Sequence, residues 1–216
     1  MIKPRFPIET ITGVTGLPPS AAGMRIGLFG GSFNPAHEGH RLVALQCLRR
    51  LELDALWLLV SPGNPLKPLG DLAPLSERVR QARQIVAHPR IRVTGFEAEH
   101  GFRYTYDTLR FLNDTLPGRR FVWIMGADNM LGFHRWDRWQ DIAGLMPIAV
   151  YVRPGSSRIA PSSRAALALN RYRLEESDAP RLADCEPPAW VYLHGLMSGL
   201  SSSDIRAGRH TGATAI

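Results

Sequence analysis

The sequence predicts an α/β protein with a Rossmann-like, doubly wound parallel sheet and a short C-terminal helical region. Short apolar runs alternate along the chain with segments of helical periodicity. The apolar runs are continuous, which is typical of parallel strands covered by helices on both faces. Right-handed crossovers make such a fold doubly wound, and its ligands bind at the carboxyl ends of the strands. Ligand-binding and catalytic residues are therefore expected directly after the strands.

Six apolar runs are expected to form strands. The first, MRIGLF, ends in a pair of glycines, and the second, ALWLLV, is closed by a loop rich in proline and glycine. The expected strands are Met24–Phe29, Ala55–Val60, Ile91–Thr94, Arg120–Met125, Pro147–Val152 and Trp190–His194.

Helices are predicted where apolar residues recur at helical spacing. In the first helix Leu42, Leu45 and Leu48 share one side. The segment Gly155–Pro188, rich in Ser, Ala, Arg and Pro, predicts only a loop with a short helix. The expected helices are Glu38–Leu51, Leu75–Ala87, one from Thr105 to about Asn113, and a last helical turn at Ser202–Ala207.

Residues 1–22 are expected to form a flexible N-terminal arm, and residues 23–216 a single domain. The length of 216 residues suits one α/β domain with a full core. No apolar run approaches the roughly 20 residues of a membrane span, so no membrane partner is expected. The two cysteines, Cys47 and Cys185, show no metal-ligand spacing. A reducing cytoplasm fits this cysteine usage best.

The net charge of +7 favours an anionic partner but does not determine which class of anion it is. Nucleic acid, an anionic membrane or a phosphorylated small molecule would each fit. The basic residues are scattered, however, and form no basic run interleaved with aromatic residues, as a nucleic-acid groove would suggest. Most of the arginines, which include Arg78, Arg80 and Arg83, are expected on solvated helix faces.

The strongest chemical signal is GGSFNPAHEGH, directly after the first strand. Two glycines let the backbone turn sharply and approach a phosphate closely, and the following helix presents N–H groups and a positive dipole end. His37 and His40 are three apart, so both can face one side and donate to phosphate oxygens. Such donors suit a phosphoryl-type transition state. The candidate nucleotide-binding residues of this segment are Gly30, Gly31, Ser32, Phe33 and Gly39.

Two plainer interpretations remain open for this segment taken alone. The glycine pair could form only a tight turn, and His37 and His40 could belong to a metal site, although no third ligand is evident nearby. The segment matches neither the G-x-G-x-x-G nor the P-loop fingerprint. No metal-ligating residue is predicted.

GGSFNPAHEGH resembles the T/HxGH signature region of the nucleotidylyltransferase superfamily, in the form found in bacterial nicotinate-nucleotide adenylyltransferases. The resemblance extends from about Met24 to Arg206. Asn34 stands where the usual form has Asp, which removes a charge but keeps a side-chain acceptor.

Two further segments carry this resemblance. SPGNPLK follows the second strand, and its Lys67 could reach a phosphate as a point charge. YTYDT resembles a stretch of the family in which Thr105, at a helix N-cap, would leave main-chain N–H donors for an anionic carboxylate. Taken alone, Lys67 would be a solvated loop lysine and Thr105 a simple helix cap.

After the strand RFVWIM, the sequence GAD resembles the family's GxD motif. Gly126 and Asp128 are therefore candidate nucleotide-binding residues, and the carboxylate can accept hydrogen bonds from ribose hydroxyls. The resemblance implies that Trp136 stacks on the pyridine ring of the acceptor, with Asp137 beside it in the substrate site. Trp139 is assigned to the core.

LSSSDIR near the end of the chain resembles the family's ISSTxIR motif. Ser202 and Ser203 would open a helix there, and Arg206 would add a forked cation one turn later. Together they would clamp a phosphate. Without the resemblance the segment would be only a helix-capping signal.

The resemblance implies transfer of AMP from ATP to nicotinate mononucleotide, which gives nicotinate adenine dinucleotide and pyrophosphate in NAD biosynthesis. The acceptor phosphate would attack the α-phosphorus directly, so no covalent intermediate is needed. His37, His40, Lys67 and Arg206 would hold the triphosphate, and Mg²⁺ would be held mainly by ATP. The rivals are another transferase of the superfamily, a nucleotide-binding regulator without catalysis, and a basic nucleic-acid binder.

Overall fold

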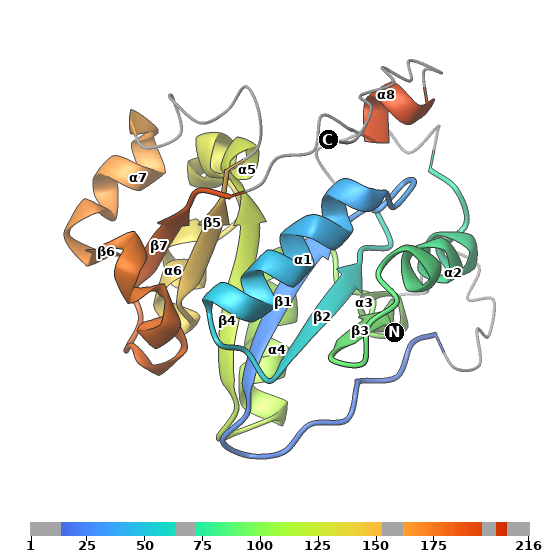
Figure 1. Cartoon of the computed structure of the whole chain (residues 1–216), viewed down its shortest axis with the longest axis horizontal. Helices are drawn as coiled ribbons and strands as arrows, with labels where there is room; N and C mark the ends of the chain where they lie inside the picture. Colours follow the sequence, from blue (N-terminus) through green and yellow to red (C-terminus); the bar gives the residue numbers. More distant parts are fainter. Residues whose placement is uncertain (1–13, 64–71, 153–161, 196–201, 207–216) are drawn as a thin grey trace.

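Parallel strands form one seven-stranded sheet in the order β3-β2-β1-β4-β5-β7-β6 (Figure 1). The computed structural model describes residues 14–63, 72–152, 162–195 and 202–206, with no side-chain description for Ser203 and Asp204. Every strand pair is parallel, as the continuous apolar runs predicted. The strands are β1 Arg25–Gly31, β2 Ala55–Val60, β3 Ile91–Thr94, β4 Arg120–Gly126, β5 Ile148–Tyr151, β6 Arg173–Leu174 and β7 Trp190–Leu193.

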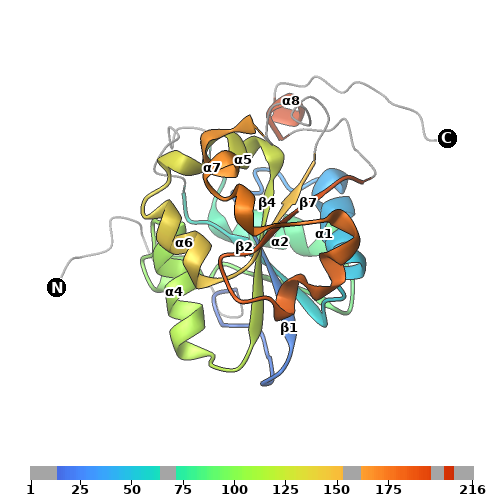
Figure 2. The ribbon, with the colours of Figure 1, turned by 90° about the vertical axis from the view of Figure 1, so that its left-hand side faces the viewer.

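Helices cover both faces of the sheet (Figures 1 and 2). One face packs against α1 (Glu38–Arg50), α2 (Leu75–Ile85) and the 3₁₀ segment η4 (Glu176–Asp184). The other face packs against α4–α7. Among the described residues, the bounds of the other helices are α3 Phe96–Glu99, α4 Thr105–Thr115, α5 Ala127–Gly132, α6 Trp139–Leu145, α7 Arg164–Ala168, α8 Ser202–Arg206 and the 3₁₀ segments η1 Phe133–Arg135 and η3 Asn170–Tyr172.

Both faces of the strands are apolar because alternate residues enter the two cores. In β2, Trp57 and Leu59 join the core under α4 and α6, whereas Leu56 and Leu58 join the core under α1 and α2. All six residues of β2 are buried. A strand covered on both sides therefore shows the continuous apolar run that identified it in the sequence.

The order of the strands reverses at β1, which lies between β2 and β4. Phe29 of β1 lies opposite Ile124 of β4, so the two strands end side by side. Their following segments lead to helices on opposite faces, because α1 covers one core and α5 the other. In doubly wound folds this point forms the ligand crevice.

The segment 155–188 was predicted less completely than the rest. Its described part contains α7, η3, the two-residue strand β6 and η4, where the sequence indicated a loop and a short helix. Two residues are too few to show a period, and the nine residues of η4 carry an internal proline.

Residues 14–22, the described part of the predicted arm, lie on the domain. The amide of Gly95 donates to the carbonyl of Val14 at 2.9 Å, and the Thr94 hydroxyl donates to the carbonyl of Gly16 at 2.9 Å. Farther along, the Arg119 guanidinium donates to the carbonyl of Ser20 at 3.0 Å. These bonds fix the described stretch beside β3 and the start of β4.

The glycine pair after the first apolar run does not make the turn that the sequence suggested. Gly30 and Gly31 are the last residues of β1, and neither has a positive φ. The left-handed residue is Phe33, with φ 45°. Gly30 is required for space instead, because a Cβ there would collide with the indole of Trp123 in β4.

We expect Gly30→Ala to destabilise the fold by about 1–3 kcal/mol, the usual cost of overpacking a core. Trp123 is buried, and its rigid indole has little room to move aside. Gly144→Ala in α6 is the matched control, because a Cβ there meets nothing within 4 Å. Urea unfolding of both variants measures the difference. Equal stability of Gly30→Ala and the unaltered protein would contradict this packing argument.

Candidate active site

The imidazoles of His37 and His40 both accept hydrogen bonds from backbone amides at the entrance of α1. His37 is the N-cap residue, and its Nδ1 accepts the amide hydrogen of Gly39 at 3.1 Å. In return, the amide of His37 donates to Nδ1 of His40 at 3.2 Å. This reciprocal arrangement is a capping box built from two imidazoles. The prediction that both rings face the same side is confirmed, because their centroids are 3.9 Å apart.

The capping box determines the tautomer of both imidazoles. A ring nitrogen that accepts a hydrogen bond carries no hydrogen, so each neutral ring carries its hydrogen on Nε2. Protonation at Nδ1 would cost the bond to the backbone. The Nε2–H groups of His37 and His40 are therefore the donors that these rings can offer to an anion.

Aromatic packing fixes the orientation of His40. The ring of Phe33 meets it edge-on at 4.9 Å between centroids, and Phe29 meets Phe33 edge-on at 5.6 Å. His37 and His40 are 5% and 7% exposed. The loop after β1 thus carries two nearly buried imidazoles whose orientation is set before any ligand arrives.

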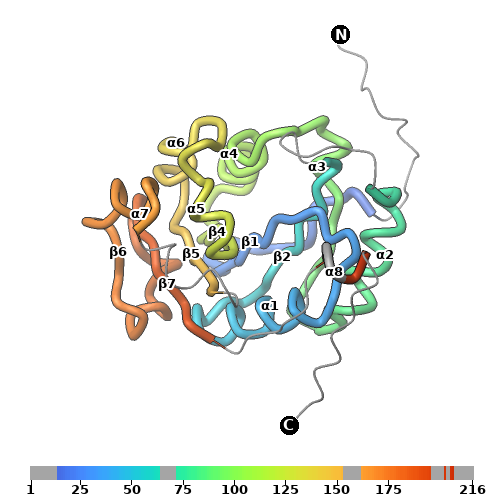
Figure 3. Tube along the Cα trace, turned by 90° about the horizontal axis from the view of Figure 1, so that it is seen from above, coloured from blue at the N-terminus to red at the C-terminus, as the bar shows by residue number. Residues whose placement is uncertain are grey.

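The C-terminal motif contacts this same loop. The hydroxyl of Ser202 donates to the carbonyl of Pro35 at 3.0 Å, and the Arg206 guanidinium donates to the carbonyl of Asn34. In Figures 1 and 3, α8 lies beyond the carboxyl ends of the strands, on the side where α1 begins. Two segments far apart in the sequence are therefore neighbours here. Lys67 and the side chain of Ser203 lie outside the described residues.

Gly126 and Asp128 lie at the carboxyl end of β4, beside the loop after β1. Gly126 ends the strand and is the N-cap residue of α5, and Asp128 is exposed in the first turn of that helix. An exposed carboxylate at this edge of the sheet can accept hydrogen bonds from ligand hydroxyls.

Trp136 lies half-buried just after η1. Its ring meets that of Phe133 edge-on at 5.4 Å, and Trp139 meets Phe133 in the same way at 5.8 Å. Both tryptophans pack against the core on this face of the sheet. Asp137 is exposed.

Thr105 is not the N-cap that the sequence suggested. Tyr104 is the N-cap residue of α4, with extended backbone and no side-chain cap bond, and the amide of Asp107 donates to its carbonyl at 3.1 Å. Thr105 is therefore the first helical residue. In the next turn, the hydroxyl of Thr108 donates to the Glu97 carboxylate at 2.7 Å. Burial raises the pKa of Glu97.

A cation–π contact joins the two predicted acceptor segments. The guanidinium of Arg138 lies 3.8 Å from the ring centroid of Tyr106 in α4 and is paired with Asp141 at 2.7 Å. Arg138 adopts a left-handed backbone, with φ 51°, at the N-cap of α6. These contacts hold the Trp136–Asp137 segment against the helix that begins at Thr105.

Arg78 lies in the interior, not on the solvated helix face that is expected for most of the arginines. Its side chain is 1% exposed. The signal was the position within the helix, because Arg78 comes three residues after Leu75 and four before Ala82, on the apolar side of α2. Its positive charge had instead suggested a side chain exposed to solvent.

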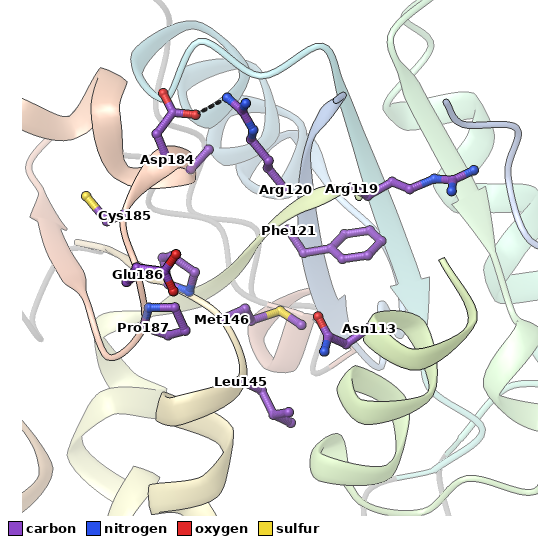
Figure 4. Close-up of a pocket in the computed structure, with 12 residues that line it drawn as sticks. Asn113, Arg119, Arg120, Phe121, Leu145, Met146, Asp184, Cys185, Glu186 and Pro187 are labelled. Atoms are coloured by element: carbon purple, nitrogen blue, oxygen red, sulfur yellow. Dashed lines mark hydrogen bonds and ion pairs between the residues drawn. The ribbon is translucent and has the colours of Figure 1, made fainter. Parts of the chain in front are cut away.

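A cavity of about 390 Å³ lies at the opposite end of the sheet (Figure 4). Phe121 and Met146 line it, close to the amino ends of β4 and β5. Asp184 at its rim is paired with Arg25 at 2.6 Å and with Arg120 at 2.5 Å. Among the residues that the structure describes, none of those predicted for the active site lines this cavity.

The fold and the loop after β1 define a nucleotide-binding α/β protein of the nucleotidyltransferase class. Residues 28–208 match the cytidylyltransferase-like family model. A probable nicotinate-nucleotide adenylyltransferase of Methylorubrum extorquens is 58% identical over 183 residues, which cover 85% of this chain and 99% of the relative. One from Mesorhizobium japonicum is 53% identical over 190 residues, covering 88% and 97%. The chain belongs to the cytidylyltransferase-like family, among the nicotinate-nucleotide adenylyltransferases.

Solved structures share the fold. The nicotinic acid mononucleotide adenylyltransferase of Plasmodium falciparum, complexed with NaAD, matches with a TM-score of 0.64 at 17% sequence identity. The match covers 85% of this chain and 83% of that one. The predicted α/β fold class is thus confirmed. Among the described residues, no helix is long and apolar enough to cross a membrane.

A pair of substitutions at His37 separates the helix cap from the imidazole. Asn is among the best N-cap residues, so His37→Asn should keep the acceptor for the Gly39 amide, whereas His37→Ala should cost about 1 kcal/mol of stability. Both variants lack the Nε2–H donor, so both should lose at least about a hundredfold in kcat/KM for adenylyl transfer. Urea unfolding and steady-state kinetics measure the two effects. Full activity in folded His37→Asn would show that the imidazole serves only as a cap.

Proposed function

We propose that this protein transfers AMP from ATP to nicotinate mononucleotide, forming nicotinate adenine dinucleotide and releasing pyrophosphate in NAD biosynthesis. The observation that carries the proposal is the capping box of His37 and His40, which turns two Nε2–H donors into fixed features of a helix entrance. Donors already in place need no reorganisation when negative charge develops on a phosphoryl group.

In this proposal the loop after β1 binds the triphosphate. Main-chain groups of Gly30, Gly31, Ser32, Phe33 and Gly39 line its path, and His37 and His40 donate to phosphate oxygens. Arg206, with Ser202 and Ser203, closes over the same loop, as its bond to the Asn34 carbonyl suggests. Lys67 adds a further cation.

The acceptor side of the site is proposed to lie between α4 and the segment after η1. Trp136 stacks on the pyridine ring, Asp137 lies beside it, and the start of α4 at Thr105 meets the carboxylate of the ring. Asp128 binds ribose hydroxyls. The contact of Arg138 with Tyr106 supports this placement, since it holds the two segments together.

The chemical step then needs little beyond positioning and charge stabilisation. The acceptor phosphate is already ionised near neutral pH, so one of its oxygens attacks the α-phosphorus without a strong base. Pyrophosphate leaves from the opposite side. The Nε2–H groups of His37 and His40 stabilise the charge that builds on the phosphoryl oxygens.

We propose Mg²⁺ as the metal that accompanies ATP, held mainly by phosphate oxygens and water. The donors of this site fit that arrangement, because imidazole N–H and guanidinium groups bind phosphate oxygens and leave the metal to ATP. When bound, Mg²⁺ neutralises part of the charge on the leaving pyrophosphate.

We also propose a cytoplasmic location. Cys47 and Cys185 are both free thiols, which suits a reducing compartment. Burial raises the pKa of the Cys47 thiol to about 12, so that thiol stays protonated and inert.

The direct test is the purified protein with ATP, Mg²⁺ and a panel of phosphorylated acceptors, scored for pyrophosphate and for the dinucleotide. Nicotinate mononucleotide should be preferred over the amide nucleotide by about ten- to a hundredfold in kcat/KM, because a carboxamide turns its NH₂ toward donors that suit a carboxylate. A preference for phosphopantetheine would indicate a different transferase of the superfamily. ATP binding without pyrophosphate release would indicate a nucleotide-binding regulator that lacks catalysis. Salt-sensitive binding of unrelated DNA would indicate a nucleic-acid-binding protein.

Arg206→Ala should raise the KM for ATP about tenfold and leave the KM for nicotinate mononucleotide nearly unchanged, because a charged donor to the triphosphate is lost. Arg206→Lys should recover only part of the loss, since an ammonium lacks the planar fork. Removing residues from His210 onward is the control and should leave ATP use intact. Parallel changes in both KM values would place Arg206 outside the triphosphate site.

A further inference from the structure

Arg78 joins three loop segments from the interior of the protein. Its Nε donates to the carbonyl of Ala73 at 2.8 Å. One terminal nitrogen, Nη1, donates to the carbonyls of Ser32 at 2.7 Å and Ser61 at 2.8 Å. With only 1% of the residue exposed, the planar guanidinium is held by main-chain oxygens on several sides.

All three carbonyls belong to segments at the carboxyl edge of the sheet. Ser32 follows β1, Ser61 follows β2, and Ala73 precedes α2. The same segments are joined by two further bonds. The amide of Ala73 donates to Oδ1 of Asn34 at 3.2 Å, and the amide of Ser61 donates to the carbonyl of Gly31 at 3.0 Å. Arg78 thus connects, from the interior, the segments that surround the loop leading to His37.

The charge of Arg78 has no carboxylate partner in the part of the chain that the structure describes. On the same helix, Arg80 is exposed and paired with Glu77 at 2.7 Å. Burial lowers the pKa of the Arg78 guanidinium to about 10, so the group remains a cation near neutral pH. A buried cation matched only by carbonyl dipoles is costly, and an anion bound nearby would offset that cost.

We propose that Arg78 is a positioning residue for the triphosphate of ATP: it fixes the loop after β1 through the Ser32 carbonyl and supplies a buried positive charge that a bound polyphosphate balances. This inference rests on the proposed function only in taking that loop as the phosphate site. The Ser32 carbonyl, drawn inward toward Arg78, leaves the opposite edge of its peptide unit, the N–H of Phe33, to face the ligand. The Ser61 and Ala73 carbonyls precede Pro62 and Pro74, which have no N–H, so their bonds to Arg78 fix only the position of the neighbouring segments.

An arginine suits this position better than a lysine. The guanidinium directs its donors in a fixed plane and so meets carbonyls from three segments, whereas an ammonium concentrates its donors at one point. Arg78→Lys keeps the charge and loses this geometry. Arg78→Gln loses the charge and keeps two donors. Each variant therefore removes one of the two proposed contributions: Arg78→Lys the positioning of the carbonyls, and Arg78→Gln the positive charge.

The test measures binding to the full chain by isothermal titration calorimetry, without any acceptor. The probes are ATP, inorganic tripolyphosphate and adenosine. Arg78→Lys and Arg78→Gln should each bind tripolyphosphate and ATP about tenfold more weakly than the unaltered protein, while adenosine affinity changes less than about twofold. Arg83→Lys is the matched control, because Arg83 lies on the same helix and also donates to a backbone carbonyl, that of Val93.

Folded Arg78 variants that bind tripolyphosphate like the unaltered protein would overturn the inference, and so would an equal loss of adenosine affinity. If the unaltered protein bound neither ATP nor tripolyphosphate, the proposed function and the inference would both fail. Arg78-dependent tripolyphosphate binding without transfer to nicotinate mononucleotide would leave the inference standing and remove only the proposed function.

A measurement on the unaltered protein applies even if both variants fail to fold. Nuclear magnetic resonance can follow hydrogen exchange at Nε of Arg78, with Nε of Arg83 as the internal reference. Tripolyphosphate should slow exchange at Arg78 several-fold and leave Arg83 unchanged, because the loop in front of Arg78 becomes more rigid. An exchange rate at Nε of Arg78 that is the same with and without tripolyphosphate would contradict the positioning role.

Discussion

The hydrogen bonds between the His37 and His40 imidazoles and the backbone at the start of α1 are the constraint on which the site depends. They use Nδ1 of both rings to begin a helix, and this use fixes the hydrogen of each ring on Nε2. One set of bonds thus determines where α1 starts, how the rings are oriented and which atoms can meet an anion. Histidine is a rare N-cap residue, and a pair of histidines in a capping box is difficult to explain by helix stability alone, since Ser, Asp or Asn would cap as well.

The loop that carries this pair is fastened from both sides. From the interior, Arg78 binds the carbonyl of Ser32. From the outside, Ser202 binds the carbonyl of Pro35, and Arg206 that of Asn34. The side chain of Asn34 adds its own bond, from Oδ1 to the amide of Ala73. An Asp at that position would offer the same acceptor oxygen, so this bond does not depend on which of the two residues is present.

The sequence was sufficient for most of the framework and for part of the site. Strands such as Ala55–Val60 were predictable because burial on both faces leaves an uninterrupted apolar run. The strand β6 was not, because two residues carry no period. Arg78 was misjudged because its charge suggested solvent, although its helical phase with Leu75 and Ala82 placed it inside. The turn at Phe33 was assigned to the preceding glycines, whose real constraint, the indole of Trp123, comes from a strand about ninety residues away and is not visible in local sequence.

The two sides of the strand-order reversal differ in chemistry, and the proposed reaction needs that difference. Around the end of β1 the proposed functional groups are donors and cations: His37, His40 and Arg206. Around the end of β4 they are the exposed carboxylate of Asp128 and the half-buried ring of Trp136. A triphosphate is favoured on the first side and disfavoured beside a carboxylate, whereas ribose hydroxyls and a pyridine ring suit the second. In the proposed function, two substrates sorted in this way meet beyond the carboxyl ends of the neighbouring strands β1 and β4. The acceptor phosphate in this proposal reaches the edge of the donor-rich side, next to the α-phosphorus. The Nε2–H groups of His37 and His40, which are proposed to hold ATP, would there stabilise the charge of the transferring group.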